Sequence, residues 1–191
     1  MRITQDINDV LNFSPSADQV VGFHSTSCAA SIRIEERGFM PNKIFELADH
    51  ERLIAIAKAQ GVDTFSYENW LSMRSVTFTI IPDDALKHTA HGKAGGQGLK
   101  NISQILEKLP NALDEGDQSF VARLAESIDA IRSDQSITYV VDLSTLGPRL
   151  DKDKLQPFYY YRWNPDEALP EFSEIAPDRI LVKLIHAHAE V

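Results

Sequence analysis

Apolar residues follow two kinds of spacing along this chain, and the two kinds fall in different parts of it. Apolar positions three or four apart, or compact runs closed by a stop residue, predict helices at 28–37, 46–60, 102–109 and 120–131. Alternating or continuous apolar runs rich in β-branched and aromatic residues predict strands at 20–24, 75–81, 137–143, 158–163 and 179–186. Helices dominate the first two-thirds and strands the last third, which favours an α+β fold over regular βαβ units.

Glycine and proline mark the ends of several of these elements. Gly38 and Gly61 stop the first two helices, and Pro110 closes the third. Residues 88–98 form a Gly-rich stretch that resembles a phosphate loop at first sight. It lacks the closing Gly-Lys-Ser/Thr, and no strand immediately precedes it. We therefore expect a surface loop there, with a lid over a substrate or cofactor as the alternative.

Length and composition indicate one globular domain spanning residues 1–191, without internal repeats or a linker. The net charge of −9 argues against a broadly basic nucleic-acid surface, although 87–100 carries three lysines and two histidines without a carboxylate. No stretch approaches the roughly 20 apolar residues of a membrane helix, and the first residues lack the apolar core of a signal peptide. A single cysteine cannot form an internal disulfide, which suits a reducing cytoplasm. Export by a specialised secretion machine is also compatible with this sequence.

The candidate metal ligands and nucleophiles are sparse. His88 and His91 are three apart and could share a helix face, but no third ligand lies close in sequence. His186 and His188 fall on one side of the last strand, where a solvated strand end explains them. Cys28 has no surrounding protease motif, so a small buried residue is the better interpretation. We predict no metal site.

The first strand carries polar side chains to its junction with a helix. Phe23-His24-Ser25-Thr26-Ser27 ends the strand, and the helix begins at Cys28. A helix N-terminus offers free N–H groups and partial positive charge to an anion. This junction is therefore a candidate ligand site that includes His24. A second candidate is a polar connection before the last strand that bears Glu171 and Glu174.

Three features of the chain together resemble the ADP-ribosyltransferase superfamily. The first is Phe23-His24-Ser25-Thr26, followed by a helix and Gly38-Phe39. The second is a central strand bearing hydroxyls, Arg74-Ser75-Val76-Thr77-Phe78-Thr79. The third is Glu171-Phe172, followed by Ile175-Ala176-Pro177-Asp178-Arg179-Ile180 and the last strand. The order of these features is also the family's order. Within the family, they are most similar to the diphtheria-toxin-like group with a His-Tyr-Glu site.

The resemblance implies a fold and a set of roles. The fold would consist of split antiparallel β-sheets flanked by helices. NAD would be the substrate, with Glu171 as the catalytic carboxylate and His24 and Thr26 binding the cofactor. Ser25 stands where the family usually has glycine and would lie against the nicotinamide amide. Glu171 and Glu174 are three apart, so the Glu-x-Glu pair of the arginine-modifying subgroup is absent.

Two positions of the implied site stay open. The central tyrosine would be Tyr67, or Ser75 would take its place if the strand supplies this position. The aromatic ring stacked on nicotinamide would be Tyr67 or one of Tyr159, Tyr160 and Tyr161. Glu171 would stabilise the oxocarbenium-like sugar as the nicotinamide–ribose bond breaks.

Three functions follow from these features. The first is NAD-dependent transfer of ADP-ribose to a macromolecule, a protein in preference to a nucleic acid, as a bacterial toxin or effector would do. The second is a non-catalytic binding module that keeps the fold and has lost NAD. The third is phosphotransferase-like chemistry on RNA ends, for which the basic segment 87–100 is the only support.

Overall fold

The computed structural model describes residues 1–41, 45–90, 96–110, 112–164 and 166–186. Its elements, in chain order, are β1 (Arg2–Thr4), α1 (Asn8–Leu11), β2 (Val21–Ser27), α2 (Cys28–Arg37), α3 (Leu47–Ala59), α4 (Phe65–Ser72), β3 (Ser75–Thr79), α5 (Pro82–Ala90), α6 (Gly96–Leu106), α7 (Glu115–Ser133), β4 (Ser136–Asp142), the 3₁₀ turn η1 (Gly147–Arg149), β5 (Leu150–Lys152), β6 (Phe158–Arg162), the 3₁₀ turn η2 (Pro177–Arg179) and β7 (Ile180–Ile185).

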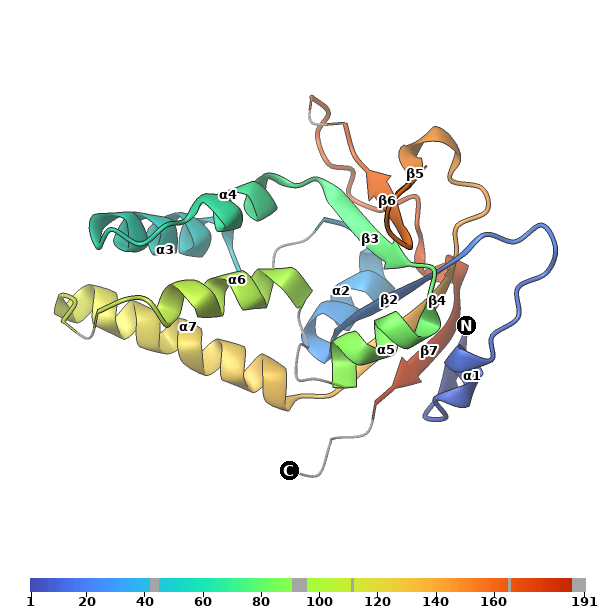
Figure 1. Cartoon of the computed structure of the whole chain (residues 1–191), viewed down its shortest axis with the longest axis horizontal. Coiled ribbons are helices and arrows are strands. Elements are labelled where there is room, and N and C mark those ends of the chain that lie inside the picture. Colours follow the sequence, from blue (N-terminus) through green and yellow to red (C-terminus); the bar gives the residue numbers. More distant parts are fainter. Residues whose placement is uncertain (42–44, 91–95, 111, 165, 187–191) are drawn as a thin grey trace.

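The strands of the described residues form one sheet in the order β1-β7-β4-β2-β3-β6-β5 (Figure 1). All neighbouring strands are antiparallel except β1, which runs parallel to β7. The prediction of an α+β fold is confirmed at this level. From β4 onward, the described part of the chain contains only strands and 3₁₀ turns, as the apolar pattern predicted.

The sheet opens between β2 and β3. β2 pairs with β4 over all seven of its residues, and β3 pairs with β6 over all five. In contrast, β2 and β3 meet at one pair, Phe23 and Thr79. The two strands therefore diverge beyond that pair, towards the C-terminal end of β2. His24 is the first residue of β2 on the open side.

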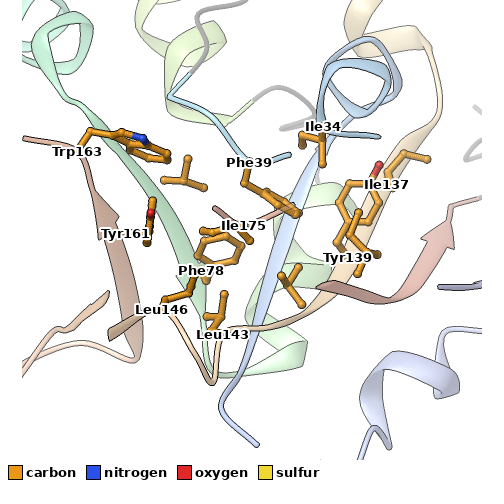
Figure 2. Packing of buried hydrophobic residues seen from close by; sticks show 13 residues of the cluster. Ile34, Phe39, Phe78, Ile137, Tyr139, Leu143, Leu146, Tyr161, Trp163 and Ile175 are labelled. Carbon is orange, nitrogen blue, oxygen red and sulfur yellow. The ribbon is translucent and has the colours of Figure 1, made fainter. Parts of the chain in front are cut away.

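Helices cover the two faces of the sheet. On one face, α2 contributes Ile34 and the segment after it contributes Phe39 to a cluster with side chains from β3, β4 and β6 (Figure 2). We call this the α2 face. On the other face, α5 and α1 contribute Ala85, Leu86 and Val10 to a second cluster. Because side chains alternate along a strand, neighbouring residues of β2 belong to different faces.

The helices α3, α4, α6 and α7 pack beside the sheet around a core of their own (Figure 1). Asp114 caps α7, where its Oδ1 accepts a hydrogen bond from the Asp117 N–H at 2.9 Å. Apolar residues at helical spacing, including Phe120, Leu124 and Ile128, face the other three helices. No helix in the described parts of the chain is both long and apolar enough to span a membrane.

The expected surface loop over 88–98 is wrong for its first and last residues, which belong to helices. Helix α5 continues to Ala90, and α6 already begins at Gly96. Residues 91–95, including His91, lie outside the described residues, as does His188. The apolar pattern also failed to predict the helices α1, α4 and α5 and the short strands β1 and β5, because these elements are brief. The lid alternative for this segment stays a prediction.

Candidate functional site

One row of side chains crosses the α2 face of the sheet and includes His24. The strand registers place Lys183, Tyr139 and His24 opposite one another in β7, β4 and β2. The pair Phe23–Thr79 brings Phe78 of β3 opposite His24, and the row continues through Tyr159 of β6. His24 therefore lies near the middle of the sheet, beside the opening between β2 and β3.

His24 bridges that opening. Its Nδ1 lies 2.9 Å from the carbonyl oxygen of Thr77 in β3. A carbonyl oxygen only accepts, so Nδ1 carries the proton and donates it. The imidazole ring also meets Phe39 and Phe78, with centroids 5.3 and 5.5 Å apart. These contacts fix the orientation of the half-buried ring at the place where the strands separate.

The segment that bears Glu171 is attached to the segment that follows α2. Gly38 ends α2 with a φ of +80°, and the Phe39 N–H donates to the Ile175 carbonyl at 3.0 Å. Ser173 is buried, and its hydroxyl donates to the Phe39 carbonyl at 2.8 Å. The loop before η2 is thereby held against Phe39, whose ring packs on His24.

Replacing Gly38 with alanine is expected to cost more than the ~1–2 kcal/mol that a left-handed backbone costs an L-residue. The added Cβ would lie 2.4 Å from the Ile175 carbonyl oxygen and 2.9 Å from the Ser173 Cβ. Gly61→Ala is the matched control, because Gly61 has a φ of +72° and no atom within 4 Å of its Cβ position. Urea unfolding measures both losses. Equal losses would contradict the close packing of the loop on Gly38.

Glu171 itself is exposed at this loop, next to the exposed Phe172. Its carboxylate forms no hydrogen bond or ion pair with any other described residue. The structure thus connects its loop to His24 through Phe39. Thr26, two residues after His24 and on the same face of β2, is 8% exposed and lies mostly under its neighbours.

The Ser25 side chain points to the opposite face of the sheet, away from His24, while the contact of its backbone with the nicotinamide amide stays a prediction. Its hydroxyl donates to the Ala85 carbonyl of α5 at 2.6 Å, so the Thr138 hydroxyl donates to Ser25 Oγ at 2.8 Å. Thr138 Oγ1 in turn accepts from His186 Nε2 at 2.8 Å, and burial lowers the pKa of His186. The Cβ of Ser25 therefore does not crowd the His24 side of the strand.

The structure also places Tyr67 and Ser75 away from His24. Tyr67 is 2% exposed in the core of the helical group, where its hydroxyl bonds Nδ1 of His50 and its ring stacks on Trp70. A ring so buried does not stack on a ligand. Ser75 begins β3 opposite Arg162, and alternation places it on the face opposite Phe78. Neither residue completes the site as expected.

Tyr159 is the aromatic side chain of β6 that the structure brings to the row of His24. It is half-buried and pairs with Phe78, the ring that touches His24. Tyr161 shares this face but is fully buried. Tyr160 faces the other way, under the guanidinium of Arg162. The period of two in strands separates the three tyrosines and favours Tyr159 among the open alternatives.

A partly buried charge network, which the sequence pattern did not predict, holds α2 on the same row. Glu35 of α2 accepts hydrogen bonds from the Tyr139 hydroxyl at 2.7 Å and from the Lys183 ammonium. Burial pushes the pKa of Glu35 upward, but these two hydrogen bonds and the charge of Lys183 outweigh it and lower the pKa. The network fixes the helix that carries Gly38 and Phe39 at its end.

Glu35→Gln is expected to lower stability most near neutral pH and least in acid. Because the folded-state pKa of Glu35 lies below the ordinary 4.5, its contribution is complete above that value and is lost as pH falls through the folded pKa. Urea unfolding of both proteins from about pH 7 to about pH 3 measures the difference. Glu36→Gln, at the exposed neighbour, is the control. A difference that stays constant with pH would contradict this assignment.

Comparisons with known proteins leave the site to be interpreted from its own residues. No family model, curated protein or solved structure matches this chain.

Among the described residues, no three His, Cys, Asp or Glu side chains are grouped to hold a metal ion. The row offers a fixed imidazole and a half-buried tyrosine, and the loop that bears an exposed carboxylate is attached beside it through Phe39. Such groups orient a polar aromatic ligand and stabilise positive charge.

Proposed function

We propose that this protein transfers ADP-ribose from NAD to a macromolecular acceptor. The observation that carries the proposal is the meeting of three separate segments of the sequence at His24. Thr77 accepts a hydrogen bond from its ring, Phe39 packs on that ring, and the Glu171 loop is bonded to Phe39. These are the segments in which the sequence resembles the ADP-ribosyltransferases.

The architecture supports the same proposal. The resemblance implied split antiparallel sheets flanked by helices, and the sheet here opens between β2 and β3 with helices on both faces. The two strands separate beside His24, the residue that would bind the cofactor. The net charge of −9 favours a protein acceptor over a nucleic acid.

Each residue of the proposed site has a chemical role. His24 and Thr26 bind the ribose and amide groups of NAD, and Tyr159 stacks on the nicotinamide ring. The Glu171 carboxylate faces the ribose and stabilises the positive charge that develops as the nicotinamide–ribose bond breaks. The acceptor then attacks the sugar carbon, and nicotinamide departs with the bonding electron pair.

Titration calorimetry with millimolar NAD tests the proposed cofactor site. We expect saturable binding to the unmodified protein and its loss in His24→Ala. Ser25→Ala is the matched control, because Ser25 is the next residue of the same strand and faces α5. Labelled NAD in a cell lysate should then mark the acceptor. No binding to the unmodified protein would favour a non-catalytic module.

A further inference from the structure

Two buried hydrogen-bond donors lie side by side at one end of the cluster on the α2 face. Tyr161 is fully buried and Trp163 is 5% exposed, and their rings meet edge to face with centroids 4.5 Å apart (Figure 2). Among the described residues, neither the Tyr161 hydroxyl nor the Trp163 indole N–H finds a hydrogen-bond partner. Buried donors without acceptors are rare in folded proteins because they cost stability. The pair therefore points to an acceptor from outside the protein.

Arg149 adds a permanent positive charge at the same place. Its guanidinium lies 3.1 Å from the Glu174 carboxylate and 3.5 Å from that of Glu167. Both carboxylates are more than half exposed, so each ion pair contributes little and is open to exchange with another anion.

The Glu174 carboxylate leaves the aromatic donors unsatisfied. Burial raises the pKa of Tyr161, the interaction with the Glu174 carboxylate raises it further, and the interaction with the Arg149 guanidinium offsets only part of this rise. The phenol therefore remains protonated and able to donate. Its hydroxyl interacts with both Arg149 and Glu174, but neither contact has the geometry of a full hydrogen bond. The direct contact of the Glu174 carboxylate is with the guanidinium, at 3.1 Å.

We propose that Arg149, Tyr161 and Trp163 form a binding site for a phosphoryl group, which displaces Glu174 from Arg149. The guanidinium fork binds two oxygens of the group, and the phenol and the indole N–H donate to the others. A phosphoryl group has more oxygens than a carboxylate, so it can accept from the phenol and the indole while two of its oxygens pair with the guanidinium. None of the three residues belongs to the proposed NAD site, so this inference goes beyond the transfer reaction.

The two tryptophans of the chain give a direct test. In a ¹H–¹⁵N spectrum of the full chain, each tryptophan contributes one indole N–H resonance, and Trp163→Phe identifies the one of interest. Inorganic phosphate is titrated at constant ionic strength against chloride. We expect a saturable shift of the Trp163 resonance, while that of Trp70, in the helical group, stays in place. No shift, or equal shifts of both resonances, would overturn the proposal.

Variants of the charged residues sharpen the test. Arg149→Gln should weaken phosphate binding by roughly tenfold or more, and Glu174→Gln should strengthen it by removing the competing carboxylate. Arg162→Gln is the control, because this arginine lies over Tyr160 on the other face of β6. Unchanged affinity in both Arg149→Gln and Glu174→Gln would contradict the site.

Two further titrations identify the source of the phosphoryl group. Displacement of phosphate by NAD would assign the site to the diphosphate of the cofactor. Binding of phosphate that NAD does not displace would assign it to a separate phosphorylated ligand. His24→Ala separates the two proposals, because it should abolish NAD binding and leave the phosphate response of Trp163 unchanged.

Discussion

Glu171→Gln is expected to reduce the transfer of ADP-ribose from labelled NAD on the order of 10²-fold or more. Glutamine keeps the size of the side chain and removes the charge that would stabilise the sugar cation. The effect should fall on the rate of transfer and not on folding. Glu171 is exposed and makes no hydrogen bond or ion pair with another described residue, so unfolding in urea should be unchanged.

The controls for Glu171 come from the same part of the molecule. Glu36→Gln changes an exposed carboxylate of α2 and should leave transfer intact. Full transfer activity in Glu171→Gln would show that Glu171 is not the catalytic carboxylate. Loss of ADP-ribose transfer in Glu174→Gln, with transfer retained in Glu171→Gln, would assign the catalytic role to Glu174 instead. Retained NAD binding in Glu171→Gln would show that the loss concerns the chemical step.

Most strands and most helices were predictable because their signals are local. Val76, Phe78 and Thr79 belong to a β-branched, aromatic run that forms β3, and Phe120, Leu124 and Ile128 repeat at helical spacing in α7. Such patterns state which face of an element is apolar. They do not state which strands lie side by side, and the opening between β2 and β3 depends on that pairing.

Two patterns in the sequence already indicated where the side chains of candidate site residues point. Ser25 follows His24 directly, but alternation along a strand sends the two side chains to opposite faces of the sheet. Tyr67 and Trp70 are three apart, a helical spacing that places both in α4 and its core.

The Glu35 network and the contact between Phe39 and the Glu171 loop could not be predicted in this way. Glu35 and Lys183 are separated by 148 positions, and only the order of strands in the sheet brings them together. The same holds for Phe39 and Ile175. The resemblance implied that Gly38-Phe39 and the Glu171 segment belong to one site, but not that they touch.

Phe39→Ala is expected to lower the free energy of unfolding by about 3–5 kcal/mol, a large part of the ~5–15 kcal/mol of a typical domain. Phe39 is 1% exposed, and its ring contacts His24, Phe78 and Tyr139. Removing it leaves a cavity between the sheet and the segment after α2. Chemical denaturation measures the loss.

Phe172→Ala is the matched control, because Phe172 is 59% exposed on the loop that Phe39 holds. Its removal should change stability by no more than about 0.5 kcal/mol. Phe39→Leu keeps most of the volume and should fold, yet it removes the ring that orients the His24 imidazole. If Phe39 joins His24 to the Glu171 loop as proposed, Phe39→Leu should weaken NAD binding while remaining folded. Unchanged NAD affinity in Phe39→Leu would mean that His24 and the Glu171 loop do not depend on this ring for NAD binding.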